Sequence, residues 1–188
     1  MRKVRLMIPG PTEVSPEVCH KLSEPMLPHY GDDWSGFYHE VVGKVKKVFQ
    51  TGNELYIPAA TSSSGMEMAL LHAAEPGEKI LVCNNGFFGD RFTEMAQLLG
   101  LEVVTVKSVH GEPITARQVG EALEKQSDVK ALAIVHNESS TAVESPLEGI
   151  LAETAKRGVI SIVDCVSSMG GVDVPTDKLE PIRVTPIL

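Results

Sequence analysis

Cysteine, positive charge and long apolar runs are all scarce in this 188-residue sequence. The cysteines Cys19, Cys83 and Cys165 lie far apart and form no CxxC pair, so reduced thiols of a cytoplasmic protein are expected, not a disulfide framework. Acidic residues outnumber basic ones by 25 to 17 and give a formal net charge of −8, which argues against a nucleic-acid partner. No apolar run is long enough for a signal-peptide core or a membrane span, so no membrane partner is expected.

Motifs of two other enzyme classes are missing as well. The sequence contains no G-x-S-x-G segment, which argues against a hydrolase with a Ser/His/acid triad. Its six histidines are scattered without a ligand spacing such as HExxH, so no metal site is expected. With 43% hydrophobic and 22% charged residues, the composition is that of an ordinary globular protein with a substantial core.

What the sequence does contain is a regular alternation of strands and helices after residue 57. Apolar runs predict strands over 79–83, 102–106, 129–135 and 159–163, and helical periodicity predicts helices over 66–74, 89–99, 115–125 and 146–156. Before them, we expect a short helix from Pro16 with Ser15 as its N-cap, a loop over 25–34 and a helix over 37–49. The alternation predicts an α/β fold of three layers, α/β/α, around a mostly parallel sheet. In such a sheet the ligand crevice lies at the carboxyl ends of the strands.

The first polar loop, residues 59–65, is a candidate phosphate cradle. It reads AATSSSG, in which small residues permit close approach of a ligand and hydroxyl groups can donate hydrogen bonds. The helix that follows adds the positive end of its dipole. A serine-rich helix cap has the same appearance, and both interpretations stay open.

Three further polar loops follow predicted strands. The glycine turn NGFFGDR, residues 85–91, could stack an aromatic ring on a flat ligand, although both phenylalanines could instead be core. The cluster HNESST follows a buried strand, but its His136 could be a satisfied buried histidine. Asp164 closes an apolar strand, where burial of a carboxylate is unfavourable unless a cation meets it. That cation could be the protonated pyridine nitrogen of pyridoxal 5′-phosphate (PLP), or Asp164 could cap the following turn.

Taken together, the segments PGPTEVSPEV, NGFFGDR, HNESSTA and VDCVSSMGG resemble the class V, fold-type I PLP-dependent aminotransferases, in their alanine–glyoxylate/serine–pyruvate branch. The resemblance runs from Pro9 to about Leu179. It implies an N-terminal segment over 1–35 and an incomplete PLP-binding large domain over 36–179. The cofactor implied is PLP, and a homodimer is the implied assembly.

The resemblance also implies roles for individual residues. Thr61, Ser62 and Ser63 would bind the cofactor phosphate, in place of the Ser-Gly-His that is frequent in the family. Phe88 would stack on the pyridine ring, where tryptophan or tyrosine is common.

On the other side of the implied site, Ser139 would hydrogen-bond near the 3′ oxygen of the ring. Asp164 would pair with the pyridine nitrogen, and Val166 would pack against the opposite ring face. Gly10 would lie near the substrate carboxylate.

The resemblance ends at about Leu179, and residues 180–188 form a divergent tail. The lysine that forms the Schiff base in the family is expected beyond Leu188, so no catalytic residue is assigned within the chain. Pro181 and Pro186 disfavour the central strand that should carry this lysine, and Lys178 lies too early to replace it. The C-terminal small domain is expected to be absent, and the chain alone is expected to have negligible transaminase activity.

Three functions are compatible with the sequence. The first is transfer of the amino group of a small amino acid, such as alanine or serine, to glyoxylate or pyruvate. The second is the related 2-aminoethylphosphonate–pyruvate transaminase reaction. The third is a non-catalytic remnant that binds a phosphorylated ligand or a partner chain.

Overall fold

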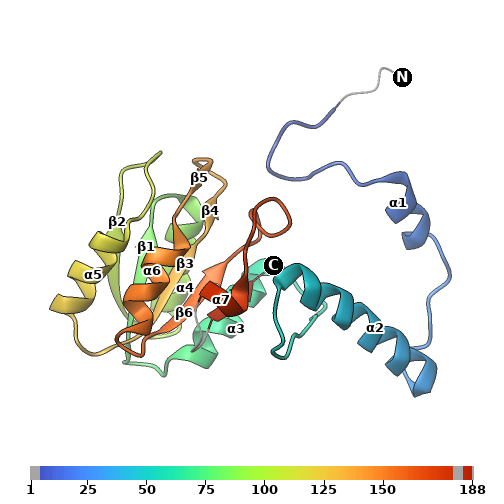
Figure 1. Ribbon diagram of the computed structural model, residues 1–188, viewed down its shortest axis with the longest axis horizontal. Helices are drawn as coiled ribbons and strands as arrows, with labels where there is room; N and C mark the ends of the chain where they lie inside the picture. The colour runs from blue at the N-terminus through green and yellow to red at the C-terminus, as the bar shows by residue number, and fades with distance from the viewer. Residues whose placement is uncertain (1–4, 180–183, 188) are drawn as a thin grey trace. The chain divides into compact units, whose positions relative to one another are not determined.

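The computed structural model describes residues 5–179 and 184–187 of the chain, which divides into two compact units, Met1–Val45 and Lys46–Leu188. The first unit holds α1 (Pro16–Leu22) and most of α2 (Gly31–Phe49), which continues into the second unit (Figure 1). As predicted, Ser15 is the N-cap of α1, and its Oγ accepts the N–H of Val18 at 3.4 Å. The predicted loop over 25–34 is too long, because α2 already begins at Gly31. No helix in the described ranges is both long and apolar enough to cross a membrane.

Five parallel strands form the centre of the second unit. They are β1 (Lys79–Asn84), β2 (Glu102–Lys107), β3 (Val129–Val135), β6 (Ile160–Asp164) and β7 (Val184–Ile187). Their order across the sheet is β2-β1-β3-β6-β7, and every neighbouring pair is parallel. The first four strands match the predicted ones to within a residue or two at each end.

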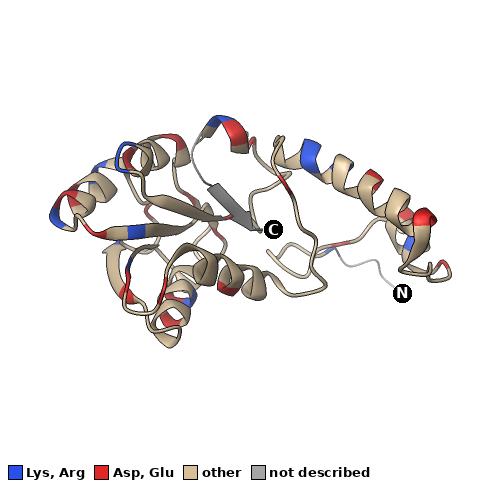
Figure 2. Cartoon of the chain, turned by 90° about the horizontal axis from the view of Figure 1, so that it is seen from below, with Lys and Arg blue, Asp and Glu red and all other residues tan. Residues whose placement is uncertain are grey.

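Helices cover both faces of this sheet and complete the three layers. On one face lie α3 (Ser62–Ala73) and α4 (Phe87–Leu98), and on the other α5 (Ala116–Lys125) and α6 (Leu147–Ala155). Successive residues of β1 alternate between the two apolar clusters: Ile80 and Val82 pack with α3 and α4, whereas Leu81 and Cys83 pack with α5 and α6. Burial on both faces explains the mostly apolar sequences of β1, β3 and β6. Most Lys, Arg, Asp and Glu residues lie on helices and loops (Figure 2).

Three small elements complete the second unit. A two-stranded antiparallel hairpin, β4 (Asn137–Glu138) and β5 (Val143–Glu144), follows β3. The short helix α7 (Thr176–Leu179) follows β6 and packs against α6. None of these elements is evident from hydrophobic periodicity, because each is only two to four residues long.

Strand β7 corrects the prediction for the divergent tail. The two prolines predict that no strand forms there, and this is wrong for residues 184–187, which pair in parallel with β6. Within the described part of the chain β7 has a neighbour on one side only. Pro186 lacks an N–H group and is tolerated at such an edge, although it would remove a hydrogen bond from a central strand. Pro181 lies outside the described residues.

Candidate functional site

The predicted site residues of the second unit gather at the carboxyl ends of the strands. Strands β3 and β6 end side by side, with Val135 opposite Asp164, so the loops that carry Ser139 and Val166 are neighbours. Asp164 follows Ile162 by two residues and therefore points to the face that α3 and α4 cover. Helix α3 packs against both β6 and α4. Since α3 runs back to the start of β1, its amino end lies at the same edge of the sheet as Asp164.

Thr61, Ser62 and Ser63 form the amino end of α3. Thr61 is the N-cap, and its Oγ1 accepts the N–H of Ser64 at 3.4 Å. The capping interpretation is therefore confirmed for Thr61. The half-buried hydroxyl groups of Ser62 and Ser63 have no hydrogen-bond partner among the described residues. Free hydroxyl groups at a helix amino end suit an anion such as phosphate.

Asp164 is a buried carboxylate, only 5% exposed, at the end of β6. Its Oδ1 accepts the N–H of Val166 at 2.9 Å, whereas no described residue hydrogen-bonds Oδ2 and no described cation pairs with it. Burial raises the pKa of the Asp164 carboxyl, the Val166 hydrogen bond lowers it, and the negative charge of Glu138 raises it. A desolvated carboxylate with one free oxygen fits a ligand that brings a protonated nitrogen, as the pyridine ring of PLP does.

Phe88 lies in the first turn of α4. The predicted helix begins two residues too late, because α4 starts at Phe87. Phe88 packs on the apolar cluster under α3 and α4, and its ring meets that of Phe87 edge-on at a centroid distance of 5.3 Å. Phe87 is 57% exposed, so the alternative that both rings belong to the core is wrong.

The remaining predicted residues are placed as follows. Ser139 is half-buried in the hairpin between β4 and β5, and its hydroxyl group has no partner within the described residues. Val166 follows Asp164 by two residues and is 43% exposed, and its packing on the ring stays a prediction. Gly10 belongs to the first unit, in the irregular segment before α1, and its role stays a prediction.

His136 is a buried histidine with partners on both ring nitrogens. Its Nδ1 lies 2.9 Å from Oγ of Ser168, and its Nε2 lies 3.6 Å from Oε1 of Glu144. Burial lowers the pKa of His136, and the Glu144 carboxylate opposes this effect. These contacts favour the structural interpretation, in which His136 joins the loop after β3 to the turn after β6.

Glu138 lies beside the predicted site residues, although the sequence pattern does not single it out. Its side chain is fully buried and accepts hydrogen bonds from Phe88, Gly89 and Ser140. The available signal was an acidic residue in a polar cluster directly after a buried strand, a position where a carboxylate needs several donors. The sequence alone could not show which donors these are.

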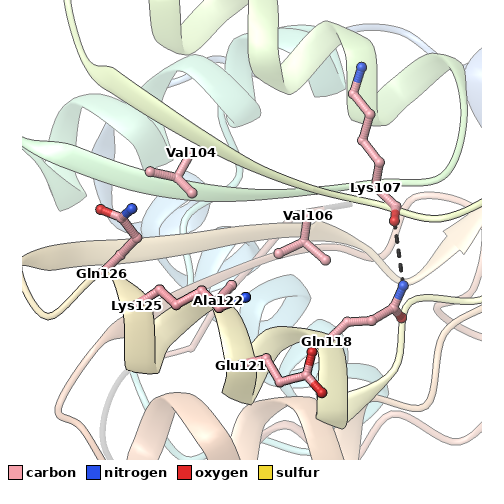
Figure 3. Close-up of a pocket in the computed structure, with 8 residues that line it drawn as sticks. All are labelled: Val104, Val106, Lys107, Gln118, Glu121, Ala122, Lys125 and Gln126. Carbon is pink, nitrogen blue, oxygen red and sulfur yellow. Dashed lines mark hydrogen bonds between the residues drawn. The ribbon is translucent and has the colours of Figure 1, made fainter.

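A hollow of about 260 Å³ lies elsewhere, between β2 and α5 (Figure 3). Val104 and Val106 form its floor, and Gln118 donates from Nε2 to the carbonyl oxygen of Lys107 at 3.4 Å. The hollow lies on one face of the sheet, and Asp164 points to the opposite face. It contains none of the predicted site residues, so the strand ends are the better candidate site.

The comparisons with known proteins identify the family of the chain. Residues 15–181 match the family described as aminotransferase class-V, and the chain belongs to this family. An uncharacterized aminotransferase of Methanocaldococcus jannaschii is 35% identical over 176 residues, which cover 94% of this chain and 46% of the relative. The alanine–glyoxylate aminotransferase of Mus musculus is 34% identical over 174 residues, covering 92% of this chain and 42% of the relative.

The solved structures give the same result. The crystal structure of the ureidoglycine–glyoxylate aminotransferase from Bacillus subtilis superimposes with a TM-score of 0.89 at 30% identity, covering 96% of this chain and 47% of that one. The predicted three-layer fold of a PLP-dependent transferase domain is confirmed. The chain spans about half the length of the curated relatives it matches.

Proposed function

We propose that this chain forms the cofactor-binding part of a PLP-dependent aminotransferase, which moves the amino group of a small amino acid, such as alanine or serine, to a 2-oxo acid such as glyoxylate or pyruvate. The observation that carries the proposal is the buried carboxylate of Asp164, which has one free oxygen and no cation among the described residues. The names of the relatives in mouse and Bacillus subtilis both contain glyoxylate, which supports glyoxylate as the acceptor.

The residues of the strand-end site have complementary roles in this proposal. PLP, when bound, supplies an electron-withdrawing ring that makes the Cα proton of the amino acid acidic. Asp164 would hold a proton on the pyridine nitrogen, because no cation among the described residues compensates its charge. Ser62 and Ser63 donate to the phosphate, and Thr61 closes the helix end beside them.

Other residues position the ring and the substrate. Phe88 and Val166 exclude water from the two ring faces, and Ser139 hydrogen-bonds near the 3′ oxygen. By the family resemblance alone, Gly10 is proposed to bind near the substrate carboxylate. Two chains are proposed to assemble as a homodimer.

The 188-residue chain is proposed to bind the cofactor without sustained turnover on its own. Lys178 is a poor candidate for a covalent anchor: it lies on α7, which packs against α6 on the face opposite to the one that Asp164 points to.

The test is to add PLP to the purified chain, measure binding, reduce with borohydride and map modified lysines by mass spectrometry. We expect reversible binding that Asp164→Asn weakens at least tenfold, and no stoichiometric adduct at a single lysine. Wild-type chain that does not bind PLP, or an Asp164→Asn variant that binds as well, would contradict the cofactor role. A stoichiometric adduct at one lysine would show instead that the chain carries its own anchor.

A further inference from the structure

Helix α4, which carries Phe88, has no N-cap side chain of its own. The residue at the cap position is Gly86, and no local side chain accepts the first N–H groups of the helix. Such groups need partners when they are buried. Here three successive N–H groups donate to the β4–β5 hairpin: Phe87 to Oγ of Ser140 at 3.0 Å, and Phe88 and Gly89 to Oε2 of Glu138 at 3.0 and 3.2 Å.

The Glu138 carboxylate is itself held in one orientation. Its other oxygen, Oε1, accepts the N–H of Ser140 at 3.1 Å and the hydroxyl group of Ser140 at 2.6 Å. The side chain is fully buried, and no described cation pairs with it. All of its partners are donors, and two of them lie at the positive end of the α4 dipole, which favours a carboxylate there.

The β4–β5 hairpin and the first turn of α4 are packed too closely for a side chain at Gly86. A Cβ at Gly86 would lie 2.4 Å from Cγ of Glu138 and 2.6 Å from Oγ of Ser140. The backbone of Gly86 is extended, with φ 174°, so glycine is required for space and not for an unusual φ. The Glu138 side chain therefore fixes the distance between the hairpin and the first turn of α4.

We propose that Glu138 is a positioning residue for the cofactor site: from the β4–β5 hairpin it fixes the first turn of α4, and with it the Phe88 ring, relative to Asp164. The inference rests on the proposed function, because it assigns Phe88 to a bound ring. Glu138 also lies close to Asp164. Burial is the main cause of the raised pKa of the Asp164 carboxyl, and the negative charge of Glu138 raises this pKa further.

The decisive substitution is Glu138→Gln, which keeps the shape of the side chain. Both carboxylate oxygens of Glu138 accept hydrogen bonds, Oε2 from the N–H groups of α4 and Oε1 from Ser140. In the glutamine variant the NH₂ group, itself a donor, would have to face one of these two sets of donors. Gly86→Ala is a second variant that displaces Glu138 without changing any charge. Asp177→Asn is the matched control, because Asp177 also accepts from Thr51, Gly52 and Asn53 but holds a different loop.

The probes are inorganic phosphate and pyridoxine 5′-phosphate, which has no aldehyde and forms no lysine adduct. Affinity is measured by calorimetry. The fixed orientation of the bound pyridine ring is measured by the circular dichroism that binding induces in the absorption band of pyridoxine phosphate. In Glu138→Gln and Gly86→Ala we expect phosphate affinity within about twofold of wild type, pyridoxine phosphate affinity at least about tenfold lower, and loss of the induced signal. Asp177→Asn should bind both probes like wild type.

The outcomes separate this inference from the proposed function. A folded Glu138→Gln variant with wild-type affinity and ring signal would overturn the positioning role. Equal weakening of both probes would also overturn it, since Glu138 would then support the fold in general and not the ring. If the wild-type chain itself does not bind pyridoxine phosphate, the proposed function fails before any substitution is made, and the positioning role fails with it.

Discussion

The backbone N–H of His136 donates to the carbonyl oxygen of Asp164 at 2.9 Å, which joins β3 and β6 at the point where both strands end. The side chains of these two residues are buried and titratable, and the fold favours the neutral form of each. Burial raises the pKa of the Asp164 carboxyl and lowers that of the His136 imidazole. Their effects on stability therefore have opposite pH dependence.

Asp164→Asn is expected to stabilise the cofactor-free chain at neutral pH. Because folding raises the pKa of the Asp164 carboxyl, its contribution to stability is complete below the ordinary pKa of an aspartate. This contribution is lost as pH rises through the pKa of the folded chain. The neutral amide avoids this loss and can still accept from Val166, so we expect a gain of about 1 kcal/mol at pH 7 that shrinks toward pH 4. Urea unfolding of both proteins between pH 4 and 8 measures the difference.

The control for this substitution is Asp128→Asn. Asp128 accepts from Nζ of Lys79 at 2.9 Å, and this hydrogen bond lowers the pKa of the Asp128 carboxyl. Its removal should destabilise the chain at neutral pH, with a difference that shrinks in acid. If Asp164→Asn had the same sign as Asp128→Asn, the Asp164 carboxylate would have a cationic partner in the folded chain.

His136 should make the fold sensitive to mild acid. Because folding lowers its pKa, the stability contribution is complete above the ordinary histidine pKa and is lost as pH falls through the folded value. The free energy of unfolding should therefore fall between pH 7 and 5 in wild type, and less steeply in His136→Gln. Ser168→Ala, which removes the partner of Nδ1, should cost about 1 kcal/mol at both pH values. Parallel wild-type and His136→Gln curves would contradict the role of His136.

The hydroxyl residues of α3 should separate into one that stabilises the helix and two that bind a ligand. Thr61→Ala removes the N-cap and is expected to cost about 1 kcal/mol of stability. The double variant Ser62→Ala/Ser63→Ala should unfold within about 0.5 kcal/mol of wild type, since these hydroxyl groups have no described partner. It should bind inorganic phosphate at least about tenfold more weakly, the value of one hydrogen bond to a charged group. Unchanged phosphate affinity would exclude this helix end as the cradle.

The sequence predicts those elements whose signals are local. The predicted bounds of strand β3, Val129–Val135, match the observed ones, because this segment is apolar except for Lys130 and is buried on both faces. Helix α5 begins after Thr115 because its capping box with Gln118 lies within three residues. The start of α4 cannot be read from local sequence, because its capping group comes from Glu138, 50 residues beyond Phe88. Strand β7 was missed because its partner β6, and not its own proline-containing segment, determines its conformation.

The candidate site divides in the same way. The position of Asp164 at the end of an apolar strand predicts it as a site residue, but the lack of a cationic partner among the described residues is a property of the folded chain. Glu138 was not predicted, because its importance depends on four hydrogen bonds that the folded chain brings together. Residue type and strand position indicate where a charge lies, whereas three-dimensional contacts decide whether that charge is already satisfied.

Gly89→Ala is expected to disturb both stability and the site. A Cβ at Gly89 would lie 2.8 Å from Cα of Asn84 and 2.9 Å from its Oδ1, which accepts the N–H of Gly86. Since Asn84 ends the central strand β1, α4 has to move, at an expected cost of about 1–3 kcal/mol. Gly43→Ala, in α2, is the control: apart from its chain neighbours and its own helix backbone, no described atom lies within 4 Å of the added Cβ, so it should gain about 0.5–1 kcal/mol from lower backbone entropy. Thermal unfolding and pyridoxine phosphate binding measure the effects, and a Gly89→Ala variant that matches wild type in both would show that the first turn of α4 can shift without consequence for the ring.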